Sequence, residues 1–208
     1  MRPEVYIFDF DGTLVHSDAL KKEAYFGLSE DIAAHPEIVR EVLHRFAERS
    51  RFETIREIYS LLGKHTGKEY DDQTIQEAVA AYSSSVLKSV LACPELEGAS
   101  SLLAYLKKIN KKSYISSNTP EETLATLIQA RQWNQYIESC FGFPSRKSDT
   151  IRYIYNLCNV TPEKVIVIGN GVSDEEAAKE NGCHFFKITH DKSLREFHAS
   201  LDRSTRYV

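Results

Sequence analysis

Apolar residues along the chain form short continuous runs, and longer stripes with the period of a helix. The continuous runs contain β-branched or aromatic residues and stop at glycine or polar segments: VYIF (5–8), SYISS (113–117), VIVIG (165–169) and FFKI (185–188). Runs of this length and composition are typical of buried strands. Helix-period patterns separate the later runs. Strands alternating with helices predict an α/β fold with a doubly wound, Rossmann-like parallel sheet.

Residues that begin and end helices support two of these helical segments. In TPEETLATLIQA (119–130), Thr119 is predicted to be the N-cap and Pro120 the first helical residue. In SDEEAAKENG (173–182), we expect Ser173 to be the N-cap and Gly182 to adopt a left-handed conformation after the helix ends.

Residues 16–93 contain only helix-period patterns. Three apolar stripes account for them: Val39, Val42, Leu43 and Phe46; Phe52, Ile55, Ile58, Tyr59 and Leu62; Ile75, Val79, Tyr82, Val86 and Val90. This segment is predicted to be an inserted α-helical domain that follows the first strand. The expected domains are therefore an α/β core of residues 1–15 and 94–208, and a helical domain of residues 16–93.

Composition and charge narrow the classes of partner. The chain has 208 residues, a formal net charge of -4, and no apolar run long enough to cross a bilayer. Nucleic-acid binding needs a concentrated basic surface, so we expect neither nucleic-acid nor membrane partners. The acids in MRPEVYIFDFDG argue against a signal peptide, and the four cysteines have no C-x-x-C spacing. The sequence predicts a cytoplasmic protein.

Two carboxylates follow the first predicted strand. Asp9 and Asp11 in DFDGT lie two residues apart, so extended backbone would turn both side chains the same way. Such a pair is costly unless a cation or a shared proton stabilises it. A calcium EF-hand loop is excluded because its glycine stands at the sixth position, whereas Gly12 is the fourth residue from Asp9. The alternative is that both acids are solvated turn residues.

The segment FDFDGTLVHSDAL resembles the first motif, D-x-D-x-T, of the haloacid dehalogenase superfamily, and most resembles its phosphatase branch with a helical cap, the phosphoglycolate phosphatase and β-phosphoglucomutase-like proteins. The resemblance implies that Asp9 is the nucleophile, which forms an aspartyl-phosphate, and that Asp11 is the general acid and base. It also places Gly12 and Thr13 at the substrate phosphate.

Two further segments follow in the order of the family. SYISSNTP resembles the second motif, which implies that Ser117 and Asn118 bind phosphate. FGFPSRKSD contains the spacing G-x-P-x-x-K, which implies that Lys147 binds phosphate, with neighbouring Arg146 as the substitute. Taken alone, Ser117 would be a helix-capping residue and Lys147 a surface lysine.

IVIGNGVSD (166–174) has two interpretations. A dinucleotide fingerprint needs a third glycine where Asp174 stands, so that interpretation is disfavoured. The segment resembles the fourth family motif, G-D-x-x-x-D, with Asn170 in place of the first acid. The resemblance implies a Mg²⁺ site formed by Asp9, the carbonyl of Asp11, Asn170 and Asp174. Asn170 supplies no charge, so we expect looser magnesium binding or a site that has lost its activity.

The resemblance implies a magnesium-dependent phosphatase that acts on a small phosphorylated metabolite, such as a sugar phosphate or phosphoglycolate, with the insertion as a cap over the substrate. Two alternatives stay open. One is a phosphosugar mutase on the same fold, and the other is a catalytically impaired phosphometabolite-binding or regulatory protein. The expected assembly is a monomer or homodimer.

Overall fold

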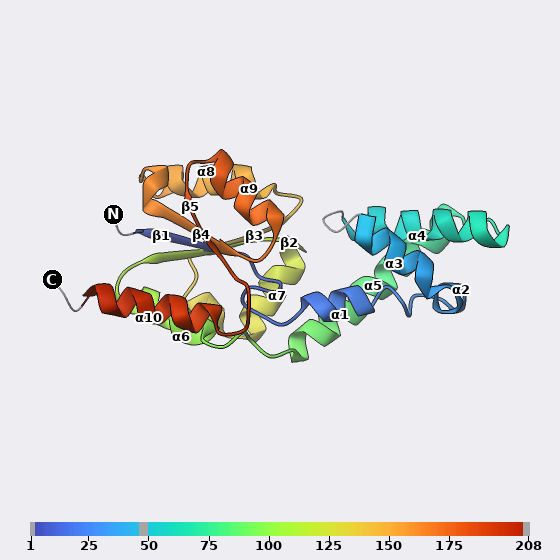
Figure 1. Cartoon of the computed structure of the whole chain (residues 1–208), viewed down its shortest axis with the longest axis horizontal. Helices are drawn as coiled ribbons and strands as arrows, with labels where there is room; N and C mark the ends of the chain where they lie inside the picture. The colour runs from blue at the N-terminus through green and yellow to red at the C-terminus, as the bar shows by residue number, and fades with distance from the viewer. Residues whose placement is uncertain (1–2, 46–49, 206–208) are drawn as a thin grey trace. The chain divides into compact units, whose positions relative to one another are not determined.

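The protein is described by a computed structural model over residues 3–45 and 50–205, with side chains as far as residue 201 (Figure 1). Phe46, from the first predicted stripe, lies outside this range. The chain separates into two compact units. One combines Met1–His16 with Cys93–Val208, and the other is Ser17–Ala92.

The first unit contains a five-stranded parallel sheet. Its strands are β1 (Val5–Phe8), β2 (Lys112–Pro120), β3 (Ser139–Phe143), β4 (Val165–Gly169) and β5 (His184–Lys187), in the order β3-β2-β1-β4-β5. Phe8, the last residue of β1, pairs with Ile115 on one side and with Ile168 on the other, and β2 continues beyond Ile115 as far as Pro120. The predicted doubly wound α/β fold is therefore confirmed. The segments that follow β1, β2 and β4 emerge at one edge of the sheet, where such folds bind ligands.

Helices cover both faces of this sheet (Figure 1). They are α6 (Ala99–Lys108), α7 (Glu121–Ala130), α8 (Lys147–Leu157), α9 (Val172–Glu180) and α10 (Ser193–Thr205), with short 3₁₀ turns at Trp133–Gln135 and Pro162–Lys164. Val5 and Ile7 pack with Ile151 of α8 and Ala178 of α9 in one apolar cluster. The alternate residue Tyr6 contacts the ring of Phe197 in α10, with centroids 6.4 Å apart. Strand alternation therefore buries β1 on both faces.

Two predicted helix starts are wrong, although the helices exist. Helix α7 begins at Glu121, because Thr119 and Pro120 still belong to β2. Helix α9 begins at Val172, and the side chain of Asp174, rather than Ser173, completes its first turn by accepting from the Gly171 N–H at 3.1 Å. The end of α9 is as predicted: Gly182 has a φ of 69°.

The regular elements of the second unit are all helices over its described residues, joined by turns and short extended segments. It contains α1 (Asp18–Glu23), α2 (Glu30–Ala34), α3 (Pro36–Arg45), α4 (Arg51–Thr66) and α5 (Asp72–Ala92). Most members of the three predicted stripes are buried, while Phe52 is 39% exposed. Within the described residues, no helix of the protein is long and apolar enough to span a membrane.

Candidate active site

The turn after β1 fixes the first two acids. Asp9 follows the strand directly and is buried, with 5% of its surface exposed. Gly12 has a φ of 67°, a left-handed conformation that favours glycine. This lets the chain fold back, so that the N–H groups of Leu14 and Val15 both donate to the carbonyl of Phe10. The turn therefore holds Asp9 and Asp11 at the carboxyl edge of the sheet.

Lys147 lies between two buried carboxylates. Its Nζ donates to Asp9 Oδ1 at 2.9 Å and to Asp174 Oδ1 at 2.6 Å, and all three side chains are at most 9% exposed. Lys147 is the first residue of α8, and a helix N-terminus disfavours a cation. The two carboxylates offset that cost. Residues 9, 147 and 174, far apart in the sequence, thus form one buried charge cluster.

Burial and charge shift the pKa values in this cluster. Burial is the largest effect on Asp9, and with the nearby charges of Asp174 and Asp11 it raises the pKa of Asp9 to about 7, although Lys147 acts to lower it. Burial also acts to lower the pKa of Lys147, but the charges and hydrogen bonds of its two partners outweigh burial and leave its pKa above the usual value. Lys147 therefore stays protonated, and any further positive charge beside Asp9 would favour the ionised form of that carboxyl group.

A glycine makes room for Asp174. A Cβ added at Gly169 would lie 2.3 Å from Asp174 Oδ2, closer than real Cβ atoms approach. The same Oδ2 accepts from the Gly171 N–H at 3.1 Å. Glycine at position 169 thus allows Asp174, an acid in the first turn of α9, to lie against the end of β4.

Two hydroxyls hold Asp11. Asp11 Oδ2 accepts from Thr119 Oγ1 at 2.7 Å and from Ser117 Oγ at 3.3 Å. Thr119 was predicted only as a helix cap, so its contact with Asp11 was missed. Ser117 and Thr119 are two apart in an extended segment, the spacing that puts side chains on one face, and this was the available signal. Pairing between β2 and β3 is irregular from Ser116 to Pro120, as is common beside functional sites.

The other residues predicted to bind metal or phosphate differ in exposure and in hydrogen bonding. Asn170 is partly exposed, and its Oδ1 lies 3.4 Å from the hydroxyl of Thr13, which also donates to Asp9 Oδ2 at 3.3 Å. The N–H of Gly12 donates to the carbonyl of Val15, and the N–H of Thr13 to that of Phe10, so both are already used within the turn. Asn118 and Arg146 are exposed. The phosphate-binding roles of all five predicted residues stay predictions: Gly12, Thr13, Ser117, Asn118 and Lys147.

The donor atoms of the cluster suit a hard cation. The candidate ligands are the carboxylates of Asp9 and Asp174, the amide oxygen of Asn170 and the carbonyl of Asp11. All are oxygens, the ligand type that Mg²⁺ prefers. Asp174 and Asp11 both act to raise the pKa of Asp9, whereas Lys147 acts to lower it. This repulsion among the acids is what a divalent cation would relieve, so these residues fit magnesium.

Comparisons with known proteins identify the family of the chain. Residues 6–188 match the family model described as haloacid dehalogenase-like hydrolase. The chain is 22% identical over 193 residues to the phosphoglycolate phosphatase of Pseudomonas putida, across 90% of this chain and 70% of that protein. It is 27% identical over 209 residues to the phosphorylated carbohydrates phosphatase of Thermotoga maritima. That alignment covers 96% of this chain and 90% of that protein.

A solved structure shares the fold. The crystal structure of a "predicted phosphoglycolate phosphatase" from Haemophilus somnus superposes with a TM-score of 0.75 at 14% identity, covering 92% of this chain and 87% of that one. Because the family model spans most of the sequence, the chain belongs to the haloacid dehalogenase-like hydrolase family. The family membership predicted from its motifs is confirmed.

Proposed function

We propose that this hydrolase is a magnesium-dependent phosphatase that cleaves a small phosphomonoester, a sugar phosphate or a phosphoglycolate-like acid, through an aspartyl-phosphate on Asp9. Its family and its relatives put it among the phosphoric monoester hydrolases. The observation that carries the proposal is the position of Lys147, whose ammonium group donates to Asp9 and to Asp174 in a buried site. Such a cation beside an aspartate nucleophile is what an incoming phosphate dianion needs.

The first half-reaction joins Asp9 to phosphorus. A carboxylate oxygen of Asp9 attacks the phosphoryl group, the bond from phosphorus to the substrate oxygen breaks, and the carboxyl group of Asp11 protonates the leaving oxygen. Lys147 balances charge on the phosphoryl oxygens and favours the ionised form of Asp9. When phosphate binds, its oxygens partly replace Asp9 and Asp174 as the groups that accept from Lys147.

The second half-reaction regenerates Asp9. Asp11, now ionised, takes a proton from a water molecule, which attacks phosphorus and releases inorganic phosphate. Thr119 and Ser117 both donate to Oδ2 of Asp11, which fixes the orientation of this carboxyl group. We assign Thr119 a positioning role, since it acts on the reaction through Asp11.

Magnesium would be held by Asp9, the carbonyl of Asp11, Asn170 and Asp174. When bound, the ion supplies positive charge that favours ionised Asp9 and neutralises charge on the phosphoryl group. An amide at position 170 can coordinate but adds no charge, so magnesium affinity is expected to be about tenfold lower than with an acid there, by analogy with the loss of a partner around a metal ligand.

The helical unit, Ser17–Ala92, is proposed to be the cap that excludes water and selects the substrate. Its size favours a small metabolite over a protein substrate. Asn170 also supports a second candidate, a phosphometabolite-binding protein that has lost its chemistry, because the partly exposed amide stands in the motif where the family has an acid.

The test is phosphate release from a panel of sugar and short-acid phosphates at millimolar magnesium. Native protein, Asp9→Asn and Asn170→Asp are compared. Release by the native protein, abolished by Asp9→Asn and by EDTA, supports the phosphatase. Binding of a phosphometabolite without release, together with turnover gained by Asn170→Asp, would establish the binding protein instead. Conversion of a sugar phosphate to its isomer without release would establish a mutase.

A further inference from the structure

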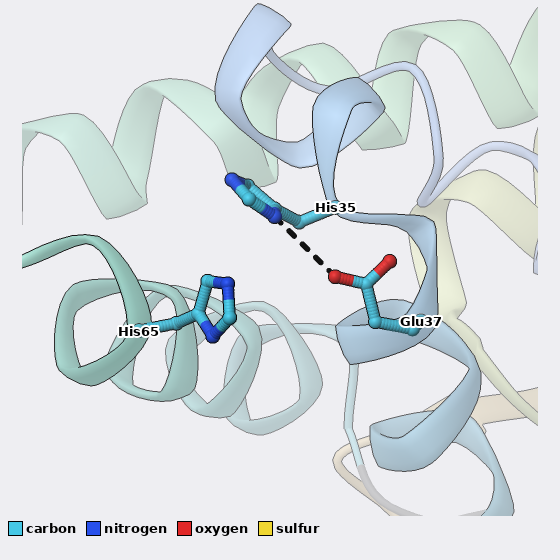
Figure 2. Close-up of side chains that lie close together, drawn as sticks. All are labelled: His35, Glu37 and His65. Carbon is cyan, nitrogen blue, oxygen red and sulfur yellow. Dashed lines mark hydrogen bonds and ion pairs between the residues drawn. The ribbon is translucent and has the colours of Figure 1, made fainter.

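A second cluster of ligand-type side chains lies in the helical unit and contains no residue of the candidate active site. His35, Glu37 and His65 each offer one ligand atom, and these atoms all lie within 4.8 Å of one another (Figure 2). His35 Nδ1 lies 3.3 Å from Glu37 Oε1, and the two imidazole ring centroids are 4.8 Å apart. His35 is half-buried, while Glu37 and His65 are exposed.

The backbone brings His35 and Glu37, which are two residues apart, together with His65 from a later helix. His35 is the C-cap that directly follows α2, and Glu37 follows Pro36 in the first turn of α3. His65 is in the last turn of α4. Asp31 of α2 accepts from Lys68 Nζ at 2.6 Å and from the Tyr70 hydroxyl at 2.9 Å, which ties the segment after α4 to α2. The position of His65 beside His35 is therefore supported by contacts outside the cluster.

The spacing suits a small tetrahedral metal ion. With metal–ligand bonds of about 2.0–2.2 Å and tetrahedral angles, neighbouring ligand atoms lie about 3.3 Å apart. The pair His35–Glu37 already has that separation, at 3.3 Å. His65 is exposed, so rotation about its side-chain bonds is the movement expected to bring a ring nitrogen to the ion.

We propose that His35, Glu37 and His65 form a site for a divalent transition metal, with Zn²⁺ as the best match. Imidazole with one carboxylate suits zinc, whereas magnesium prefers oxygen ligands and suits the Asp9 cluster. Three protein ligands leave one position for water or another donor. His35 uses the neutral Nδ1 lone pair as its ligand, so the metal replaces the hydrogen bond between His35 and Glu37.

A metal at this point would join the α2–α3 junction to the end of α4. Because the unfolded chain lacks the assembled site, binding should stabilise the folded helical unit. This inference does not depend on the phosphatase chemistry and can be tested without measuring activity.

The experiment titrates untagged full-length protein with Zn²⁺ against a chromophoric chelator, with millimolar Mg²⁺ present to occupy the oxygen-ligand site. The variants are His65→Ala, Glu37→Gln and the control His44→Ala, which removes an exposed histidine of the same unit outside the cluster. We expect one zinc ion per native chain. Affinity should fall about tenfold or more in His65→Ala and Glu37→Gln, since even removing an outer partner of a ligand costs about 10–100-fold. His44→Ala should bind as the native protein does.

Two further measurements distinguish a specific metal site from non-specific binding at the surface. Co²⁺ should give a visible absorption band of tetrahedral intensity with the native protein and His44→Ala, and not with His65→Ala. Zn²⁺ should raise the melting temperature of the same two proteins only. The proposal is overturned by an absence of saturable binding in the micromolar range, or by equal zinc affinity in the native protein and His65→Ala.

Discussion

Lys147 Nζ and Asp174 Oδ1 lie 2.6 Å apart in a site where Asp174 is only 2% exposed. The lysine begins α8 and the acid lies in the first turn of α9, so two helix N-termini meet above the ends of β1 and β4. Asp9 completes the arrangement from the end of β1. One cation thus pairs with acids from two different motifs at the carboxyl edge of the sheet.

Replacing Lys147 with methionine should destabilise the magnesium-free protein by about 3 kcal/mol, because it leaves buried carboxylates without their cation. Thermal unfolding in EDTA measures this change. Magnesium should raise the melting temperature of Lys147→Met by more than that of the native protein, since the ion replaces part of the lost charge. Lys179→Met, at an exposed position of α9, is the matched control and should change little. An equally small effect at Lys147 would contradict the ion-pair account.

The pKa of Asp9 predicts a pH dependence of stability. Its folded pKa is raised to about 7 from the ordinary value of 3.8. The folded state therefore binds this proton more tightly than the unfolded state does. The stabilisation is full below the unfolded pKa and is lost as the pH rises towards 7.

In EDTA, the native protein should accordingly lose stability relative to Asp9→Asn between pH 5 and pH 8, by about 2.5 kcal/mol. Melting temperatures of the two proteins across this range measure the difference. Saturating magnesium should remove it, because a bound cation favours the ionised carboxylate. A constant difference across the range would show that Asp9 does not titrate there.

Alanine at position 169 should disrupt the site through Asp174. Because its Cβ would lie 2.3 Å from Asp174 Oδ2, the carboxylate must move. We expect destabilisation of about 1–3 kcal/mol and a magnesium requirement raised about tenfold or more. Unfolding and the magnesium dependence of phosphate release measure the two effects. Gly27→Ala is the control, since nothing lies within 4 Å of its added Cβ. Unchanged magnesium dependence in Gly169→Ala would remove Asp174 from the metal site.

Thr119 tests the positioning of Asp11. Valine has the same shape without the hydroxyl that donates to Asp11 Oδ2 at 2.7 Å. A hydrogen bond to a charged group contributes about 1.5–3 kcal/mol, so kcat should fall about 10–100-fold in Thr119→Val. KM should change little, because Thr119 acts on the reaction through Asp11. Thr119→Ser keeps the hydroxyl and should restore most of kcat. Equal losses in the two variants would point to packing instead.

Four of the five strands, β1, β2, β4 and β5, could be predicted. Both faces of the sheet are covered, which makes β1 and β4 continuous apolar runs that are buried along their length. Strand β3 was missed. Its sequence, SCFGF, belongs to an edge strand with two exposed ends, and it contains a glycine. A Cβ at Gly142 would meet the carbonyl of Thr119 at 2.5 Å, so the close approach of β2 requires the glycine that weakened the apolar pattern.

The order of the site residues along the chain could be predicted from their motifs, and their approach follows from parallel strands whose carboxyl ends lie at one edge of the same sheet. What the sequence did not reveal is how each helix begins. Thr119 and Ser173 look like N-caps by residue type, but Thr119 donates to Asp11, and the N-cap of α9 is Gly171, whose N–H donates to the side chain of Asp174. Capping preferences describe isolated helix ends, and here the site uses the same side chains.

The central claim is that Asp9 carries the phosphoryl group, and trapping that intermediate tests it most directly. The protein is mixed with its best substrate and magnesium, quenched in acid within the first turnovers, and analysed by peptide mass spectrometry. The account predicts one added phosphoryl group on the peptide that contains Asp9, located at Asp9 and absent from Asp9→Asn. Phosphate release with no such adduct in the native protein, or with the adduct on another residue, would contradict it.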